Sequence, residues 1–73
     1  MKELIEYIAK GLVENPDSVS VKEVRGANMI VLELQVDAKD MGRVIGKDGR
    51  VANAMRTLLR VAAGERRVTL EIA

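Results

Sequence analysis

The spacing of hydrophobic residues changes repeatedly along this 73-residue chain, and the succession of spacings limits the folds open to it. Residues 2–14 repeat apolar side chains every three or four positions, which predicts an amphipathic helix that Pro16 should terminate. Residues 19–36 alternate apolar and polar side chains around a turn at 26–28, which predicts a β-hairpin with one buried face. Residues 68–72 alternate again in a last strand.

Two further helices are expected between the hairpin and the last strand, over residues 38–45 and 50–63. Asp37 is placed to cap the first of them, and Asp40 lies in its first turn, where a carboxylate favours the helix dipole. These structural roles explain both acids without catalysis. The buried side of this short helix is expected to comprise Ala38, Met41 and Ile45.

The expected order is therefore helix, strand, strand, helix, helix, strand, without repeats or linkers. Val24 lies outside the alternation of the first strand, so a bulge or an early strand end is predicted there. Gly64 stands where the C-cap of the longer helix is expected. The length suits one domain spanning residues 1–73.

The composition excludes most of the chemistry found in small domains. The chain has no cysteine and no histidine, so disulfides, the usual zinc sites, thiol nucleophiles and histidine bases are absent. Its one aromatic residue, Tyr7, cannot supply the stacking platforms that many RNA-binding domains use. No apolar run approaches the roughly 20 residues that a membrane helix needs. We expect a cytoplasmic domain with no enzymatic activity, cofactor, metal, membrane or small-molecule substrate.

The positive charge is concentrated in one third of the chain. Residues 41–67 carry seven basic and two acidic side chains, a net +5, whereas residues 1–40 carry five basic and eight acidic ones, a net −3. An anionic partner is expected at the basic segment. A basic helix surface without any ligand is the alternative.

The turn between the last two helices contains two glycines three positions apart, Gly46 and Gly49. Without β-carbons the backbone can pack closely against a ligand, and the amides that open the next helix favour a phosphate. Lys47, with Arg43 and Arg50 on either side, adds positive charge. The apolar residues that flank this turn and could form one wall of a groove are Val44, Ile45 and Val51.

Two alternatives to a polynucleotide site exist for this turn. The glycines could be caps of a purely structural helix–helix turn. A nucleotide-binding P-loop does not fit, because the glycine spacing is one residue short and Asp48 stands where a hydroxyl would hold magnesium. No base or metal site is present for a phosphate-handling enzyme.

The run from Gly42 to Arg50, in this order of elements, resembles the K-homology (KH) domain in its prokaryotic type II arrangement. The opening helix and the turn at residues 15–19 extend the likeness over the whole chain, to the small stand-alone bacterial RNA-binding proteins of the KhpA family. The resemblance implies an α+β fold, with a three-stranded sheet covered on one face by three helices. It also implies a GxxG cleft for about four nucleotides of single-stranded RNA.

Carried over by position, the resemblance implies a clamp at Gly46 to Gly49 and an apolar platform that includes strand residues near Ile30 to Leu34. Ala52 stands where many KH domains have a larger aliphatic residue, so the groove is shallower or Val51 takes that role. Binding by one such domain is expected to be weak and salt-sensitive. The RNA-binding residues so predicted are Arg43, Val44, Ile45, Gly46, Lys47, Asp48, Gly49, Arg50 and Val51.

The helix over residues 50–63 has more apolar surface than contact with one sheet requires. Its apolar side chains cover an arc of roughly 200° of the helical wheel, whereas packing on one sheet needs an arc only somewhat wider than about 100°. Part of it is expected to meet a second chain, although the other helices could cover the excess. The residues predicted at this dimer interface are Ala54, Leu58 and Val61.

The KhpA resemblance implies self-association, and pairing with a larger KH-containing protein of the Jag type. It also implies an RNA chaperone or post-transcriptional regulator connected with cell shape and cell wall biogenesis. The rival hypothesis is a protein–protein interaction module that uses the long apolar helix, with a GxxG turn that is purely structural.

Overall fold

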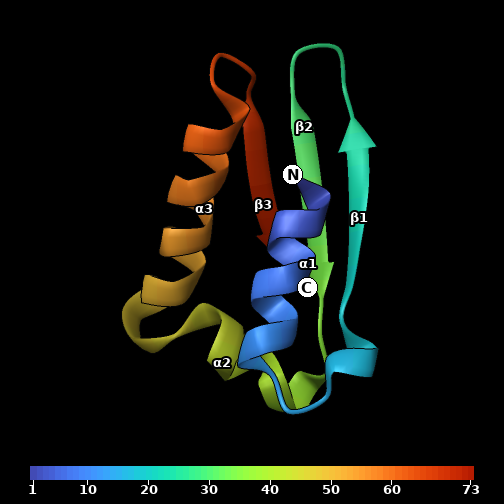
Figure 1. Ribbon diagram of the computed structural model, residues 1–73, viewed down its shortest axis with the longest axis vertical. Coiled ribbons are helices and arrows are strands. Elements are labelled where there is room, and N and C mark those ends of the chain that lie inside the picture. Colours follow the sequence, from blue (N-terminus) through green and yellow to red (C-terminus); the bar gives the residue numbers. More distant parts are fainter.

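The computed structural model describes residues 1–73. It contains a three-stranded sheet with helices packed on one face (Figure 1), and the alternation of apolar side chains along the strands directs that face toward the helices. The strands are β1 (Ser20–Arg25), β2 (Ile30–Gln35) and β3 (Val68–Ile72), in the spatial order β1-β2-β3. β1 and β2 form the predicted antiparallel hairpin, and β3 runs parallel to β2. Because β3 pairs with β2 alone, its outer edge is open.

The helices α1 (Lys2–Leu12), α2 (Met41–Ile45) and α3 (Arg50–Ala63) complete the fold. Figure 1 shows α1 lying in front of the sheet and running roughly along its strands, while α3 runs beside β3. The predicted α+β class and element order are confirmed. No helix combines the length and the apolar content that crossing a bilayer would take. The buried core joins both layers and comprises Ile5, Ala9, Val19, Val21, Leu32, Leu34, Val44, Met55, Leu59 and Leu70.

Two details of the first three elements differ from the predictions. α1 ends at Leu12 rather than residue 14, because Val13 already has extended backbone angles (φ −97°, ψ 160°). The bulge or early end predicted at Val24 is wrong, since β1 continues to Arg25 and Val24 pairs with Val31. Both valines lie on the sheet face that no helix covers, where a cross-strand apolar pair still stabilises the hairpin.

The segment predicted as one helix over residues 38–45 is divided. A 3₁₀ turn, Ala38–Asp40, precedes α2, and Asp37 caps it as predicted by accepting a 2.9 Å hydrogen bond from the Lys39 amide. Of the predicted buried side, Met41 is half-buried against the core, but the prediction is wrong for Ala38 and Ile45, which are exposed, and Val44 faces the core instead. The change from a 3₁₀ turn to an α-helix rotates the later residues relative to a continuous α-helix.

Candidate nucleic-acid interface

The loop between α2 and α3 is a tight 3₁₀ turn at Lys47–Gly49. Gly46 (φ 76°, ψ 171°), Asp48 (φ 57°) and Gly49 (φ 76°, ψ 16°) all have positive φ. The Gly49 amide donates to the Gly46 carbonyl at 3.1 Å and closes the turn. The loop is therefore a defined backbone shape that presents the side chains of Lys47 and Asp48 to solvent.

Gly46 is needed for contact as well as for conformation. A β-carbon there would lie 2.6 Å from Val51 Cγ2 and 3.0 Å from the Val51 amide nitrogen. At Gly49 the nearest atom to such a carbon would be Asn53 Nδ2 at 3.8 Å, so only its backbone angles require glycine. The close contact between Gly46 and Val51 fixes the loop against the first turn of α3.

The amino-terminal end of α3 has the features of an anion site. Gly49 is the N-cap residue, no side chain caps the helix, and its first turn contains no acid. The Arg50 amide donates to the Lys47 carbonyl of the 3₁₀ turn. The next amides of that first turn have no acceptor within the helix, and the helix dipole adds partial positive charge. A phosphate beside the loop would accept hydrogen bonds from the free amides and would interact favourably with the helix dipole.

The three basic residues predicted around the loop differ in their surroundings. Lys47 and Arg50 are exposed and take part in none of the five ion pairs of the molecule. Arg43 instead pairs with Glu14 at 2.6 Å. The positive charge available to a phosphate at the loop therefore comes from Lys47 and Arg50 more than from Arg43.

Asp40 has a role that the sequence analysis missed. It is 2% exposed, and its carboxylate accepts hydrogen bonds from the Glu14 amide (3.2 Å), the Asn15 amide (3.1 Å) and Asn15 Nδ2 (3.1 Å), with Arg43 Nε at 4.0 Å. Asp40 lies in the first turn after Asp37, as predicted, and stands at the N-cap position of α2, but its side chain makes no capping hydrogen bond there. Asp40 instead ties the segment after α1 to the start of α2, the helix that leads into the loop.

Burial alone would raise the pKa of the Asp40 carboxyl. The hydrogen bonds from Glu14 and Asn15, together with the Arg43 guanidinium, outweigh burial and hold the pKa below its ordinary value of 3.8. Asp40 is therefore an ionised structural anchor under neutral conditions. Its signal in the sequence was present but ambiguous, because an acid in a helical first turn is also a common surface feature.

The predicted apolar platform is only partly accessible. Val44 is 0% exposed, as are Leu32 and Leu34, so direct contact between these side chains and RNA is ruled out. Ile45 is 38% exposed and Val51 is half-buried. The apolar surface beside the loop is thus supplied by Ile45 and Val51, while Ala52 belongs to the interior.

A row of polar side chains extends from the loop along α3. Asn53, Arg56 and Arg60 recur at helical spacing on one side, next to the open edge of β3. Arg56 donates to the Leu70 carbonyl of β3 from Nε and from a terminal guanidinium nitrogen, both at 3.4 Å, and to Asn53 Oδ1 at 3.3 Å. Neither Arg56 nor Arg60 is among the RNA-binding residues predicted above, although their spacing of four was visible in the sequence.

Beyond Arg56, this side of α3 borders a shallow groove of about 300 Å³, which we call the α3–β3 groove. It contains three arginines and no acid. Its lining residues are Met29, Arg60, Arg66, Arg67, Val68 and Thr69. A basic strip thus leads from the GxxG loop past Arg56 to this groove.

The residues predicted to contact a second chain lie on another side of α3. Leu58 is 48% exposed, Val61 is 76% exposed, and Ala54 also lies at the surface. Their spacing of four and three places them in one stripe. The prediction that the other helices leave apolar surface uncovered on α3 is confirmed; its occupant is a separate matter.

Comparison with known proteins agrees with this geometry. A family model described as KhpA/KhpB, KH domain, matches residues 2–72. The RNA-binding protein KhpA of Caldanaerobacter subterraneus subsp. tengcongensis is 53% identical over 74 residues, and the KhpA of Clostridium acetobutylicum is 54% identical over 74, each alignment covering 99% of both chains. The KhpA of Aquifex aeolicus is 48% identical over 75 residues, covering 99% of this chain and 94% of its own.

No solved structure matches the chain at a significant level. The sequence matches nevertheless span almost all residues, and they include the GxxG loop and all the helices and strands described above. The chain therefore belongs to the KhpA/KhpB KH-domain family.

Proposed function

We propose that this chain binds single-stranded RNA, without catalysis, along the GxxG loop and the basic side of α3. The observation that carries the proposal is the uncapped start of α3, which lies behind a loop whose glycines bring the backbone to the surface beside unpaired Lys47 and Arg50. The relatives named RNA-binding protein KhpA support the choice of RNA as the polyanion.

In the proposed complex the loop amides and Lys47 hold one phosphate. Ile45 and Val51 offer apolar contact to the neighbouring bases, because no aromatic side chain is available for stacking. Arg56 and Arg60 follow the backbone toward the α3–β3 groove. Such a site uses few base-specific hydrogen bonds, so we propose broad sequence tolerance.

Exchanging Lys47 for aspartate tests the site. Lys47→Asp places a second acid beside Asp48 in the loop, and we expect it to weaken binding of a labelled single-stranded RNA at least about tenfold. Fluorescence anisotropy measures the dissociation constant. Lys2→Asp, at the exposed start of α1, makes the same charge change away from the loop and should leave binding within about twofold. Equal binding by all three proteins would contradict the proposed site.

We also propose that the chain acts as a dimer, in the role of an RNA chaperone or post-transcriptional regulator. The supporting observation is the exposed apolar stripe of Ala54, Leu58 and Val61. A second copy would cover this stripe and place two weak RNA sites in one particle, which raises the apparent affinity for a long RNA. A larger Jag-type KH protein could take the place of the second copy.

Sedimentation velocity tests the dimer. Val61→Asp puts a charge in the centre of the stripe and should shift the protein toward monomer at micromolar concentration. Asn53→Asp makes a charge change on another side of the same helix and should not. A wild-type protein that sediments as a monomer at high micromolar concentration would remove the homodimer. If Lys47→Asp leaves RNA binding intact while Val61→Asp abolishes partner binding, the protein-interaction module is the better description.

A further inference from the structure

The β1–β2 turn and the α3–β3 connection lie at the end of the molecule remote from the GxxG loop (Figure 1). These two segments line a second concave basic site. There, the β1–β2 turn faces the connection between α3 and β3 across a pocket of about 650 Å³, which we call the end pocket. Arg25, Asn28 and Ile30 come from the hairpin, and Arg66 and Arg67 come from the connection. Two segments far apart in sequence thus build one site.

The two walls of the end pocket are joined by backbone hydrogen bonds. The Ile30 amide donates to the Arg67 carbonyl at 2.8 Å, and the Gly26 amide donates to the Met29 carbonyl at 2.7 Å. The first bond ties the hairpin to the α3–β3 connection, and the second closes the hairpin turn. The concave shape therefore follows from the fold and not from chance proximity of flexible side chains.

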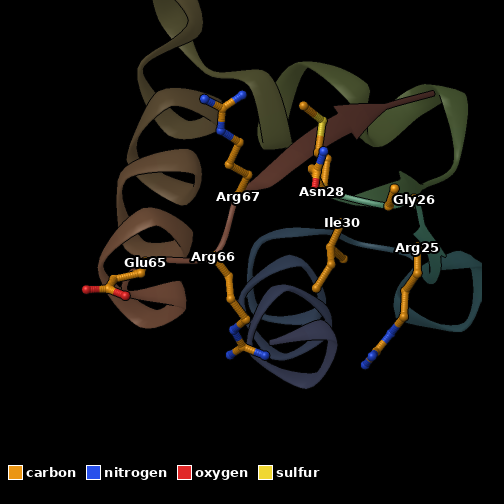
Figure 2. Close-up of a pocket in the computed structure, with 9 residues that line it drawn as sticks. Arg25, Gly26, Asn28, Ile30, Glu65, Arg66 and Arg67 are labelled. Atoms are coloured by element: carbon orange, nitrogen blue, oxygen red, sulfur yellow. The ribbon is translucent and has the colours of Figure 1, made fainter.

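The end pocket is positively charged. Arg66 and Arg67 take part in no ion pair, whereas Arg25 pairs with Glu23 at 2.6 Å. Figure 2 shows Arg25 and Arg66 extending to the same side of the pocket with Ile30 between them, and Arg67 extending to the other side. In the same view the Glu65 carboxylate, the one acid in the lining, points away from the guanidinium groups.

The end pocket is continuous with the α3–β3 groove. Met29, Arg66 and Arg67 line both of them. We propose that an RNA strand held at the GxxG loop continues along α3 and places further phosphates in the end pocket, between Arg25 and Arg66. This inference rests on the proposed function, and it lengthens the footprint beyond the about four nucleotides that a KH cleft holds.

Phosphate is the chemistry that suits this pocket. Guanidinium groups bind phosphate oxygens with paired, directional hydrogen bonds, and two arginines flanking an apolar floor match a backbone phosphate next to a base or sugar. A free nucleotide could offer the same phosphate. The strand is the proposed ligand because the pocket opens into the groove that the RNA already follows.

The test compares RNAs of two lengths. A double variant, Arg25→Gln with Arg66→Gln, is measured beside wild type against single-stranded RNAs of about four and about ten nucleotides. We expect an unchanged dissociation constant for the short RNA and a loss of about tenfold for the long one. Two lost phosphate contacts should also reduce the salt slope for the long RNA by about 1.4.

The control is Lys22→Gln, which removes a positive charge from β1 on the uncovered sheet face and should change neither affinity. Amide resonances of Gly26 and Asn28 should shift with the long RNA and not with the short one. Thermal melts of the double variant should stay close to those of wild type, because both arginines are exposed and lose only the ion pair of Arg25 with Glu23 and a 3.5 Å hydrogen bond from Arg66 Nε to the Ala63 carbonyl.

Several results would overturn the inference. An equal loss on both RNAs would show a general charge effect, and no loss on the long RNA would show that the strand ends before the pocket. Gly26 and Asn28 shifts caused by adenosine monophosphate or inorganic phosphate, without a length effect, would assign the pocket to a small anion. If wild type binds the short and the long RNA equally and Lys47→Asp abolishes binding of both, only the extended footprint is contradicted. If wild type binds no RNA of either length, the proposed RNA-binding function is contradicted as well.

Discussion

Gly46 and Gly49 hold equivalent places in the loop motif, yet the structure constrains them differently. The backbone of Gly46 lies in a region of φ and ψ that is almost exclusive to glycine, and its missing β-carbon leaves room for Val51. Gly49 has left-handed helical angles and open space around it. The first glycine sets the position of the loop on α3, and the second lets the chain turn into the helix.

Alanine substitution should separate these roles. Gly46→Ala is expected to cost about 1–3 kcal/mol for the backbone angles alone, with the Val51 clash in addition. Gly49→Ala should cost only about 1–2 kcal/mol. Thermal unfolding measures both, at roughly 4–8 °C for each kcal/mol in a domain of this size. Adding Val51→Ala to Gly46→Ala should recover part of the loss; a larger loss at Gly49 would contradict this account.

Asp40 predicts a dependence of stability on pH. Because its pKa in the folded protein lies below the ordinary value, the unfolded chain binds a proton more readily than the folded one. The stability that Asp40 contributes is therefore complete above its ordinary pKa and is lost as pH falls through the lowered one. Wild type should lose thermal stability as the pH falls below the ordinary value of 3.8.

Asp40→Asn isolates this contribution. The variant should melt roughly 5 °C lower at pH 7, because an amide cannot accept all the hydrogen bonds from Glu14 and Asn15. Its melting temperature should then change less than that of wild type as the pH falls. Parallel curves for the two proteins would mean that other carboxylates cause the acid sensitivity.

Asp40 and Val44 also show where sequence reasoning stops at the scale of single residues. The GxxG motif of the loop could be predicted from the sequence, because it is defined by residue type and by spacing along the chain. The partners of Asp40 lie 25 and 26 residues away, and no local pattern indicates them. Val44 was assigned to the groove because it adjoins the loop in sequence, whereas the 3₁₀ turn before α2 rotates it into the core.

At the scale of elements, α3 presents three different sides from one amphipathic pattern. Ala52, Met55, Leu59 and Ala63 are buried against the sheet. The row with Arg56 borders the edge of β3, and the stripe with Leu58 faces solvent. The sequence predicted that this helix was too apolar for one contact, because a wheel of its residues shows the width of the apolar arc. The wheel alone did not show that the basic row meets β3.

Two adjacent leucines test this division of α3. Leu59→Ala removes a fully buried side chain and should destabilise the protein by about 2–5 kcal/mol. Leu58→Ala, on the exposed stripe, should cost less than about 1 kcal/mol in the monomer. Urea titration measures both. If the protein is a dimer, the loss in free energy of unfolding caused by Leu58→Ala should grow with protein concentration. Equal losses for Leu58→Ala and Leu59→Ala at every concentration would contradict the assignment of Leu58 to the exposed stripe.

The strands were the most predictable elements. Alternation fixed which of their residues face the core, and Leu32, Leu34 and Leu70 are buried as that parity requires. Neither the parallel pairing of β3 with β2 nor the position of β3 at the edge followed from alternation. The structure supplies both, because parity carries no information on strand order.

At the scale of the whole molecule, a net charge of +1 conceals two unlike regions. Some acids of the first 40 residues form structural contacts: Asp40 accepts hydrogen bonds at the start of α2, and Glu14 pairs with Arg43. The basic residues of α3 and its two flanking loops are mostly free of ion pairs. Most of the basic side chains without an ion pair therefore lie along the proposed strand path from Lys47 to the end pocket; the exceptions are Lys2, Lys22 and Lys39.

This arrangement predicts a strong salt dependence in a nearly neutral protein. Each phosphate neutralised on a single strand contributes about −0.7 to the slope of log affinity against log salt concentration. For an RNA of about ten nucleotides, contacts at Lys47, along α3 and in the end pocket should give a slope of roughly −2 to −4. Anisotropy titrations at several salt concentrations measure the slope. A slope near zero would mean that the unpaired arginines do not contact phosphates, because each such contact releases counterions and makes the affinity depend on salt. The net charge of +1 is too small to produce that dependence by itself.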